Sequence, residues 1–177
     1  MVLATKSSLW GPLFRTFSTK SPFSLTSIAK PVTFRTCSDI YPQLLATSPH
    51  SNLYKKTSLT GFDLTVNYAD SALLSDPSDF DRTVVAVHGV YGYFTHFEAL
   101  FKHFHGSRVR VIAPNMPDFS HTVKHGFWHS PTERGVFLKD FLLKLGVTKV
   151  DCLVSHSSGM SPAAEIWGRV CFFKNCL

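Results

Sequence analysis

A short apolar run that ends at a cluster of small residues constrains this chain more than any other feature. Residues 150–154 are apolar apart from one aspartate, residues 155–159 read Ser-His-Ser-Ser-Gly, and a helix-compatible segment follows at residues 162–167. A strand, a tight turn and a helix in this order are typical of a nucleophile elbow, in which the turn lifts a serine hydroxyl clear of the sheet. The pattern makes Ser157 the candidate nucleophile.

Two buried strands and two helices are predicted upstream of this turn. Residues 83–87 and 109–113 are runs that are apolar apart from Thr83 and Arg110, which is typical of central strands in a parallel sheet. Apolar residues at helical spacing predict a helix over residues 94–104 and another over 131–145, the latter opened by the capping sequence S-P-T-E at 130–133. Strands that alternate with helices indicate right-handed crossovers. The predicted fold class is α/β, a mostly parallel sheet with helices on both faces.

The sheet is predicted to begin with an antiparallel pair. Residues 56–59 and 62–68 alternate polar and apolar side chains around Gly61, which favours two short strands. Residues 69–81 are rich in Ser and Asp and contain a proline, so they are predicted to form a solvated loop. Val147 is predicted to open the strand that leads to the elbow.

The first forty residues are predicted to lie outside the folded domain. Residues 1–40 are basic, rich in Ser and Thr, interrupted by three prolines, and contain a single acid, Asp39. This composition is typical of a mitochondrial transit peptide, which would place the protein in the matrix. The alternative is a disordered tail without a targeting role in a cytoplasmic protein. No run is long enough to cross a membrane.

The net charge does not indicate a nucleic-acid partner. The formal charge is +6, but five of the 18 Lys and Arg residues precede Asp39, which leaves 13 basic against 12 acidic residues in the remainder. No basic face is therefore expected to follow phosphates. The four cysteines lack the spacing of a disulfide framework or a zinc site. No cofactor is predicted, and the sequence leaves the oligomeric state open.

One histidine spacing raises the question of a metal. His121, His125 and His129 recur every fourth residue, which on a helix would align three ligands. Gly126 and the helix start at Ser130 instead predict that this stretch is a loop. The prediction is therefore that no metal binds here.

Three segments together resemble the α/β-hydrolase superfamily, and in particular its esterases and lipases. His88-Gly89 resembles the family's HG turn, residues 113–122 resemble its APDLPGFGxS loop, and residues 155–159 resemble its GHSxG elbow. Asp118, Ser120 and Ser155 stand where glycine is usual. The resemblance covers about residues 50–167. It implies an incomplete hydrolase domain over 50–168 and an atypical tail over 169–177.

The resemblance implies acyl transfer by a serine nucleophile. Ser157 would attack the carbonyl carbon, and the backbone N–H of Ser158, with that of Val90 or Tyr91, would bind the oxyanion. The remaining motif residues would shape the two turns, and these are His88, Gly89, His156 and Gly159. A small apolar acyl or ester substrate is implied. The residues expected at the mouth of its pocket are Tyr91, Tyr93, Phe94 and Phe97, although helix packing explains the two phenylalanines equally well.

The base and the acid of a catalytic triad are missing from the expected positions. In this superfamily the acid and then the histidine follow the serine. All nine histidines precede Ser157, and the only acid after it is Glu165, on the helix behind the elbow. We therefore expect the N-terminal portion of a serine hydrolase, inactive as written. The alternatives are a non-catalytic α/β-hydrolase-like protein that binds a ligand or protein, and a fragment that does not fold stably.

Overall fold

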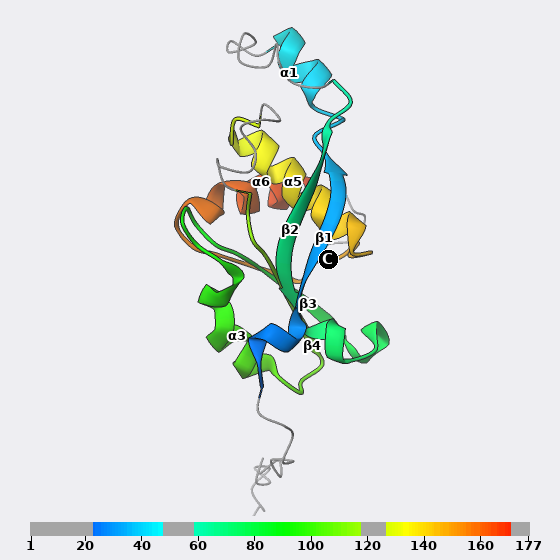
Figure 1. Cartoon of the computed structure of the whole chain (residues 1–177), viewed down its shortest axis with the longest axis vertical. Coiled ribbons are helices and arrows are strands. Elements are labelled where there is room, and N and C mark those ends of the chain that lie inside the picture. The colour runs from blue at the N-terminus through cyan, green and yellow to red at the C-terminus, as the bar shows by residue number, and fades with distance from the viewer. Residues whose placement is uncertain (1–22, 48–58, 118–126, 171–177) are drawn as a thin grey trace, which may run out of the picture.

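The structure is a computed structural model that describes residues 23–47, 59–117 and 127–170. Its strands are β1 (Ala29–Thr36), β2 (Phe62–Asp70), β3 (Arg82–Val87), β4 (Val109–Pro114) and β5 (Cys152–Ser155). They form one sheet in the order β1-β2-β4-β3-β5 (Figure 1). β3 pairs in parallel with both β4 and β5, whereas β2 pairs antiparallel with β1 and β4. The predicted parallel sheet with an antiparallel start is confirmed.

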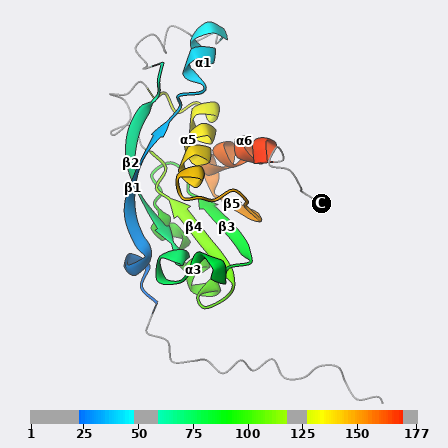
Figure 2. The same cartoon turned by 90° about the vertical axis from the view of Figure 1, so that its right-hand side faces the viewer.

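Helices cover both faces of the sheet. They are α1 (Tyr41–Thr47), α3 (Glu98–Phe104), α5 (Pro131–Lys144) and α6 (Met160–Val170), with short 3-10 turns η1 (Leu25–Ile28), η2 (Ser71–Leu74), η3 (Pro77–Asp79), η4 (Phe94–Phe97) and η6 (Ser157–Gly159). α5 and α6 lie against each other, as Figure 2 shows. Val85 and Val87 of β3 belong to the core under these two helices, whereas Val84 and Ala86 pack with Phe101 of α3. Within the described part of the chain, no helix has the length and apolar character to cross a membrane.

The start of α5 is the sequence signal that the structure reproduces most closely. The Ser130 hydroxyl accepts the N–H of Glu133 (3.2 Å), and the Glu133 carboxylate accepts the N–H of Ser130 (2.9 Å). This reciprocal pair satisfies two donors that a helix N-terminus otherwise leaves without partners. At the other end, Gly146 has a φ of +70°, as the predicted glycine cap requires.

The prediction for residues 1–40 is wrong from residue 23 onward. β1 lies in this segment and pairs with β2 along its whole length. In β1 the inward side chains of Val32, Phe34 and Thr36 alternate with outward polar residues, which is typical of a strand. The basic composition of the segment, rich in Ser and Thr, favoured the other interpretation. Pro31 is tolerated because β1 is the edge strand of the sheet. The predicted transit peptide otherwise falls on residues 1–22, outside the described residues.

Three local predictions between the strands also need correction. The antiparallel partner of β2 is β1, not residues 56–59, of which Leu59 lies in a turn and the others lie outside the described residues. The segment 69–81 is more ordered than a solvated loop, because β2 continues to a buried Asp70 and two 3-10 turns follow. Arg110 of β4 forms an ion pair with that Asp70 (2.7 Å). β5 begins at Cys152 rather than at Val147.

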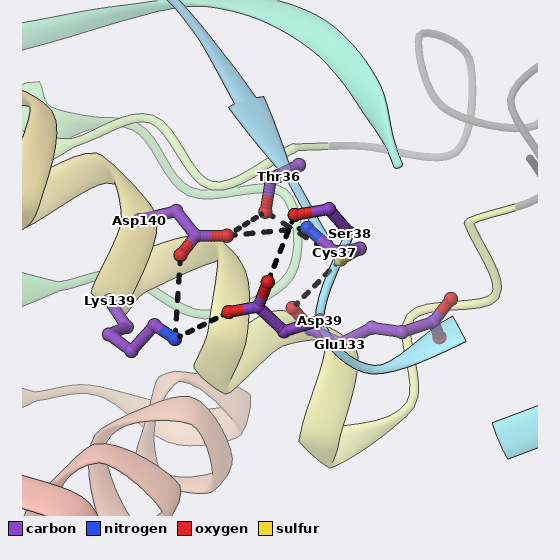
Figure 3. Close-up of polar contacts among 7 residues, drawn as sticks. All are labelled: Thr36, Cys37, Ser38, Asp39, Glu133, Lys139 and Asp140. Atoms are coloured by element: carbon purple, nitrogen blue, oxygen red, sulfur yellow. Dashed lines mark hydrogen bonds and ion pairs between the residues drawn. The ribbon is translucent and has the colours of Figure 1, made fainter. Parts of the chain in front are cut away.

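The end of β1 is attached to α5 by a group of buried polar contacts (Figure 3). The Asp140 carboxylate accepts the hydroxyl of Thr36 (2.9 Å) and the N–H of Cys37 (3.2 Å). Burial raises the pKa of the Cys37 thiol to about 12, so it stays protonated at neutral pH. It can therefore donate to the Glu133 carbonyl oxygen, 3.9 Å away. These contacts fix the N-terminal strand on the helix that precedes the elbow.

The Asp151 carboxylate joins β5 to β3 at the start of the elbow strand, and we expect it to make stability depend on pH. It accepts the N–H of Thr83 (2.8 Å) and pairs with Lys149 (3.0 Å) and Arg82 (3.1 Å). The Thr83 hydrogen bond is the main reason that the pKa of Asp151 falls to about 2 from an ordinary 3.8. Because the folded pKa is the lower one, the contribution is present above about pH 4 and is lost as the pH falls towards 2.

The size of this contribution can be measured by urea unfolding at a series of pH values. We expect Asp151→Asn to lower the free energy of unfolding at pH 7 by about 1–2 kcal/mol, after allowance for solvent screening, and to flatten its dependence on pH between 4 and 2. An Asp79→Asn control on η3, where the carboxylate is exposed, should behave as the parent chain does. Equal acid sensitivity in the parent and Asp151→Asn would contradict this assignment.

Candidate functional site

The candidate site lies where β3 and β5 end side by side. Val87 and Ser155 are register partners at the carboxyl ends of these strands, and the N–H of His156 donates to the Val87 carbonyl (3.0 Å). The chain then turns sharply, because the N–H of Gly159 returns to the His156 carbonyl (3.0 Å), and α6 begins at the next residue. The predicted order of strand, tight turn and helix is confirmed.

Ser157 stands at the corner of this turn with its backbone in the left-handed region. Its φ is +53°, which costs a residue with a Cβ on the order of 1 kcal/mol or more, and its side chain is exposed. Gly89, which follows β3, lies directly beside it, because a Cβ on this glycine would be 2.8 Å from the Ser157 Cβ and 3.3 Å from its Oγ. The strained corner therefore presents the Ser157 hydroxyl to solvent beside Gly89, the residue that follows His88.

His88 supports the turn from beneath. Its side chain is buried, its Nε2 accepts the N–H of Met116 (2.8 Å), and its Nδ1 lies 2.7 Å from the Gly89 carbonyl oxygen. Since Nε2 is an acceptor, Nδ1 carries the hydrogen and donates it to that oxygen. Burial lowers the pKa of His88, which keeps the ring neutral. His88 is thus committed to structure, as the sequence predicted, and has no ring nitrogen left to act as a base.

The turn after Gly89 brings the N–H of Val90, one of the predicted oxyanion donors, to the elbow, where it is bonded to a side chain. The N–H of Gly92 donates to the Gly89 carbonyl (3.0 Å), which closes the turn. The N–H of Val90 points to the elbow and donates to the side-chain oxygen of Ser158 (2.9 Å). The neighbouring Tyr91 has a φ of +59° and a side chain that is 95% exposed. The motif predicts a role only for the backbone of Ser158, although two adjacent serines in the sequence indicate that a second hydroxyl stands at this corner.

Sequence comparison agrees with this geometry. The chain matches the model of a family described as "Alpha/beta hydrolase of unknown function (DUF1057)" over residues 50–167. The chain belongs to this alpha/beta hydrolase family. No curated protein and no solved structure matches it. The matched range contains both the turn at His88-Gly89 and the elbow at residues 155–159, so the resemblance inferred from these motifs is confirmed at the level of the superfamily.

In this alpha/beta hydrolase domain, large apolar side chains are exposed on the turn after β3 and at the start of α6. Val90 is 60%, Tyr93 57% and Met160 63% exposed. Phe94 and Phe97, which were also predicted at the mouth of the pocket, are less exposed than these residues. Both are partly buried and pack against the core under α3. Packing under α3 accounts for them, which was one of the two interpretations left open by the sequence.

No second triad member stands beside Ser157 in the described part of the alpha/beta hydrolase domain, where no histidine or carboxylate is hydrogen-bonded to its hydroxyl. His156 is exposed next to it. The side chain of Glu165 packs on α5, since a Cβ on Gly135 would lie 2.3 Å from its Cγ. Within the described residues there is also no cluster that could hold a metal ion, and His121 and His125 lie outside them.

Proposed function

We propose that this chain carries the nucleophile and the oxyanion site of a carboxylester or acyl hydrolase. The observation that supports this most is the exposed Ser157 hydroxyl on a residue with a φ of +53°, in contact with Gly89. Acyl transfer needs a hydroxyl that can approach a carbonyl carbon while backbone N–H groups point at the oxygen that becomes negative. A strained turn between a strand and a helix meets that need, and a merely connecting turn does not require it.

The proposed reaction is ester hydrolysis through an acyl-serine. The Ser157 oxygen forms a bond to the substrate carbonyl carbon, the alcohol leaves with a proton, and water then releases the acid and restores the serine. The hydroxyl proton must pass to a base. The exposed apolar side chains of Val90, Tyr91 and Tyr93 favour a small apolar acyl group. Because no described base contacts Ser157, a test on this chain should add one.

The test is the reaction of the full chain with a fluorophosphonate probe, with and without added imidazole. In this reaction the serine oxygen bonds to phosphorus, fluoride leaves, and imidazole takes the proton. We expect labelling at Ser157, identified by peptide mass spectrometry. Imidazole should accelerate it on the order of 10-fold, less than the roughly 10²–10⁴ that a positioned base contributes.

Two variants make this result interpretable. Ser157→Ala should abolish labelling, whereas Ser161→Ala, which removes a hydroxyl from the first turn of α6, should leave it unchanged. Circular dichroism of each sample checks that it is folded. A folded parent chain that is not labelled under either condition would contradict the proposal. It would favour the alternative, a non-catalytic alpha/beta hydrolase relative that binds a ligand or protein through the same apolar turn.

A further inference from the structure

The contact between Val90 and Ser158 changes which group can bind the oxyanion. Ser158 lies one residue after the candidate nucleophile, and its hydroxyl oxygen accepts the N–H of Val90 at 2.9 Å. The two residues are 68 positions apart in the sequence and come from the turns that follow β3 and β5. Of the two amides expected to supply the second oxyanion donor, that of Val90 therefore already has a partner within the protein, and that of Tyr91 is the remaining backbone alternative.

The same contact directs the hydrogen of the Ser158 hydroxyl. A serine hydroxyl has one hydrogen to donate and two lone pairs that accept. Because the N–H of Val90 occupies a lone pair, the hydrogen is left to point elsewhere, and a hydroxyl that accepts a hydrogen bond becomes a stronger donor. Ser158 is half-buried, and its hydrogen bond with Val90 lies at the solvent-exposed surface where a substrate can reach it. Its backbone N–H lies on the same residue, so both donors can reach one oxygen bound beside Ser157.

We propose that the Ser158 side chain is a catalytic residue, the second oxyanion donor, and that Val90 polarises it without contacting the substrate. This proposal rests on the proposed function, because it assigns a further donor to the same acyl-transfer site. It replaces the expected backbone pair, Ser158 with either Val90 or Tyr91, by two donors from Ser158 alone. Val90 then acts through another residue and is a positioning residue. Because Val90 holds the Ser158 hydroxyl, binding of the oxyanion depends on the contact between the turns that follow β3 and β5.

The experiment compares Ser158→Ala and Ser158→Thr in the full chain, under the imidazole-assisted labelling conditions. Removal of one oxyanion donor costs roughly 100-fold or more in rate, so Ser158→Ala should be labelled about 100-fold more slowly than the parent. Ser158→Thr keeps the hydroxyl and should stay within a few-fold of the parent. Ser161→Ala again serves as the matched control, since it removes a nearby hydroxyl that does not contact Val90.

Two spectroscopic readouts separate donation to the oxyanion from a purely structural role. The ¹H–¹⁵N resonance of the Val90 amide in the unlabelled chain should move upfield in Ser158→Ala and return in Ser158→Thr. The ³¹P resonance of the adduct on Ser157 should also differ between the parent and Ser158→Ala, because the phosphoryl oxygen loses a donor. A structural role alone would move the Val90 resonance and leave the ³¹P resonance where it is.

The outcomes distinguish the two proposals. Labelling of Ser158→Ala at the parent rate, or an unchanged ³¹P resonance, would overturn the role of Ser158 and leave the hydrolase proposal intact. Faster labelling of Ser158→Ala would also overturn it, because the hydroxyl would then be blocking the N–H of Val90. If the folded parent is not labelled at all, the proposed function fails and the role of Ser158 fails with it.

Discussion

A Gly159→Val variant is expected to lose about 3 kcal/mol or more of its free energy of unfolding and to lose labelling of Ser157. A Cβ at Gly159 would lie 2.4 Å from the Val87 carbonyl oxygen and 2.7 Å from that of His88. Both are backbone atoms at the end of a central strand, so neither can turn away as a flexible side chain would. Overpacking a well-packed core costs about 1–3 kcal/mol and occasionally more, and a clash with fixed backbone atoms belongs at the upper end of that range. Urea unfolding measures the loss.

Gly146→Ala provides the comparison for this variant. Gly146 has a φ of +70°, but a Cβ there would meet nothing within 4 Å. Its substitution therefore measures backbone strain alone, about 1–2 kcal/mol. Gly159 does not have a positive φ, so its loss is expected to come from the close approach of α6 to β3. If Gly159→Val proves as stable as Gly146→Ala, α6 does not approach β3 as closely as the Gly159 contacts indicate, and the exposed Ser157 corner loses its structural basis.

Local signals predicted the parallel half of the sheet. Residues 83–87 and 109–113 are apolar except for Thr83 and Arg110 because each strand is packed on both faces, and this requirement is visible in any short window. The start of α5 was equally readable, since a capping box is formed by residues three positions apart. The elbow was found for the same reason. Its strand, turn and helix are contiguous, and the small residue at position 159 is needed where backbones meet.

The antiparallel half was mispredicted because its pairing is not local. β1 and β2 are separated in the sequence by α1 and by the segment 48–61. The alternation of polar and apolar residues around Gly61 instead predicted a pair of adjacent strands. An edge strand that carries Pro31 and several outward polar residues has the composition of a tail. Only the register of β1 with β2, which is set by the alternate inward residues, distinguishes this strand from a tail.

The candidate site was predicted at the backbone level and missed at the side-chain level. The positions of Ser157, Gly89 and His88 follow from the motifs, because these motifs specify backbone turns. The hydrogen bond between Val90 and the Ser158 hydroxyl depends on how two distant turns face each other, and no spacing in the sequence encodes that. The motifs therefore place the two turns, and the contact between their side chains becomes visible only in the structure.

Glu133→Ala is expected to destabilise the chain by roughly 3 kcal/mol, the second large effect. The Glu133 side chain is fully buried and accepts the N–H of Trp128 (3.1 Å), the N–H of Ser130 (2.9 Å) and the hydroxyl of Tyr41 (3.3 Å). Its removal takes the acceptor from one buried and two part-buried donors, at about 1 kcal/mol each, and also removes half of the capping box. Urea unfolding should show the loss. Glu98→Ala, at an exposed ion pair with Lys102, should cost below about 0.5 kcal/mol.

Glu133→Gln distinguishes hydrogen bonding from volume in this effect. Glutamine fills the same space but has one acceptor oxygen, so its NH₂ group must face either the donors from Ser130 or those from Trp128 and Tyr41. We therefore expect Glu133→Gln to be destabilised almost as much as Glu133→Ala. Tyr41→Phe, which removes one donor and leaves the carboxylate in place, should cost about 1 kcal/mol. A Glu133→Gln variant as stable as the parent would mean that packing, rather than the carboxylate, holds the N-terminal segment on α5 and so supports the helix that leads to the elbow.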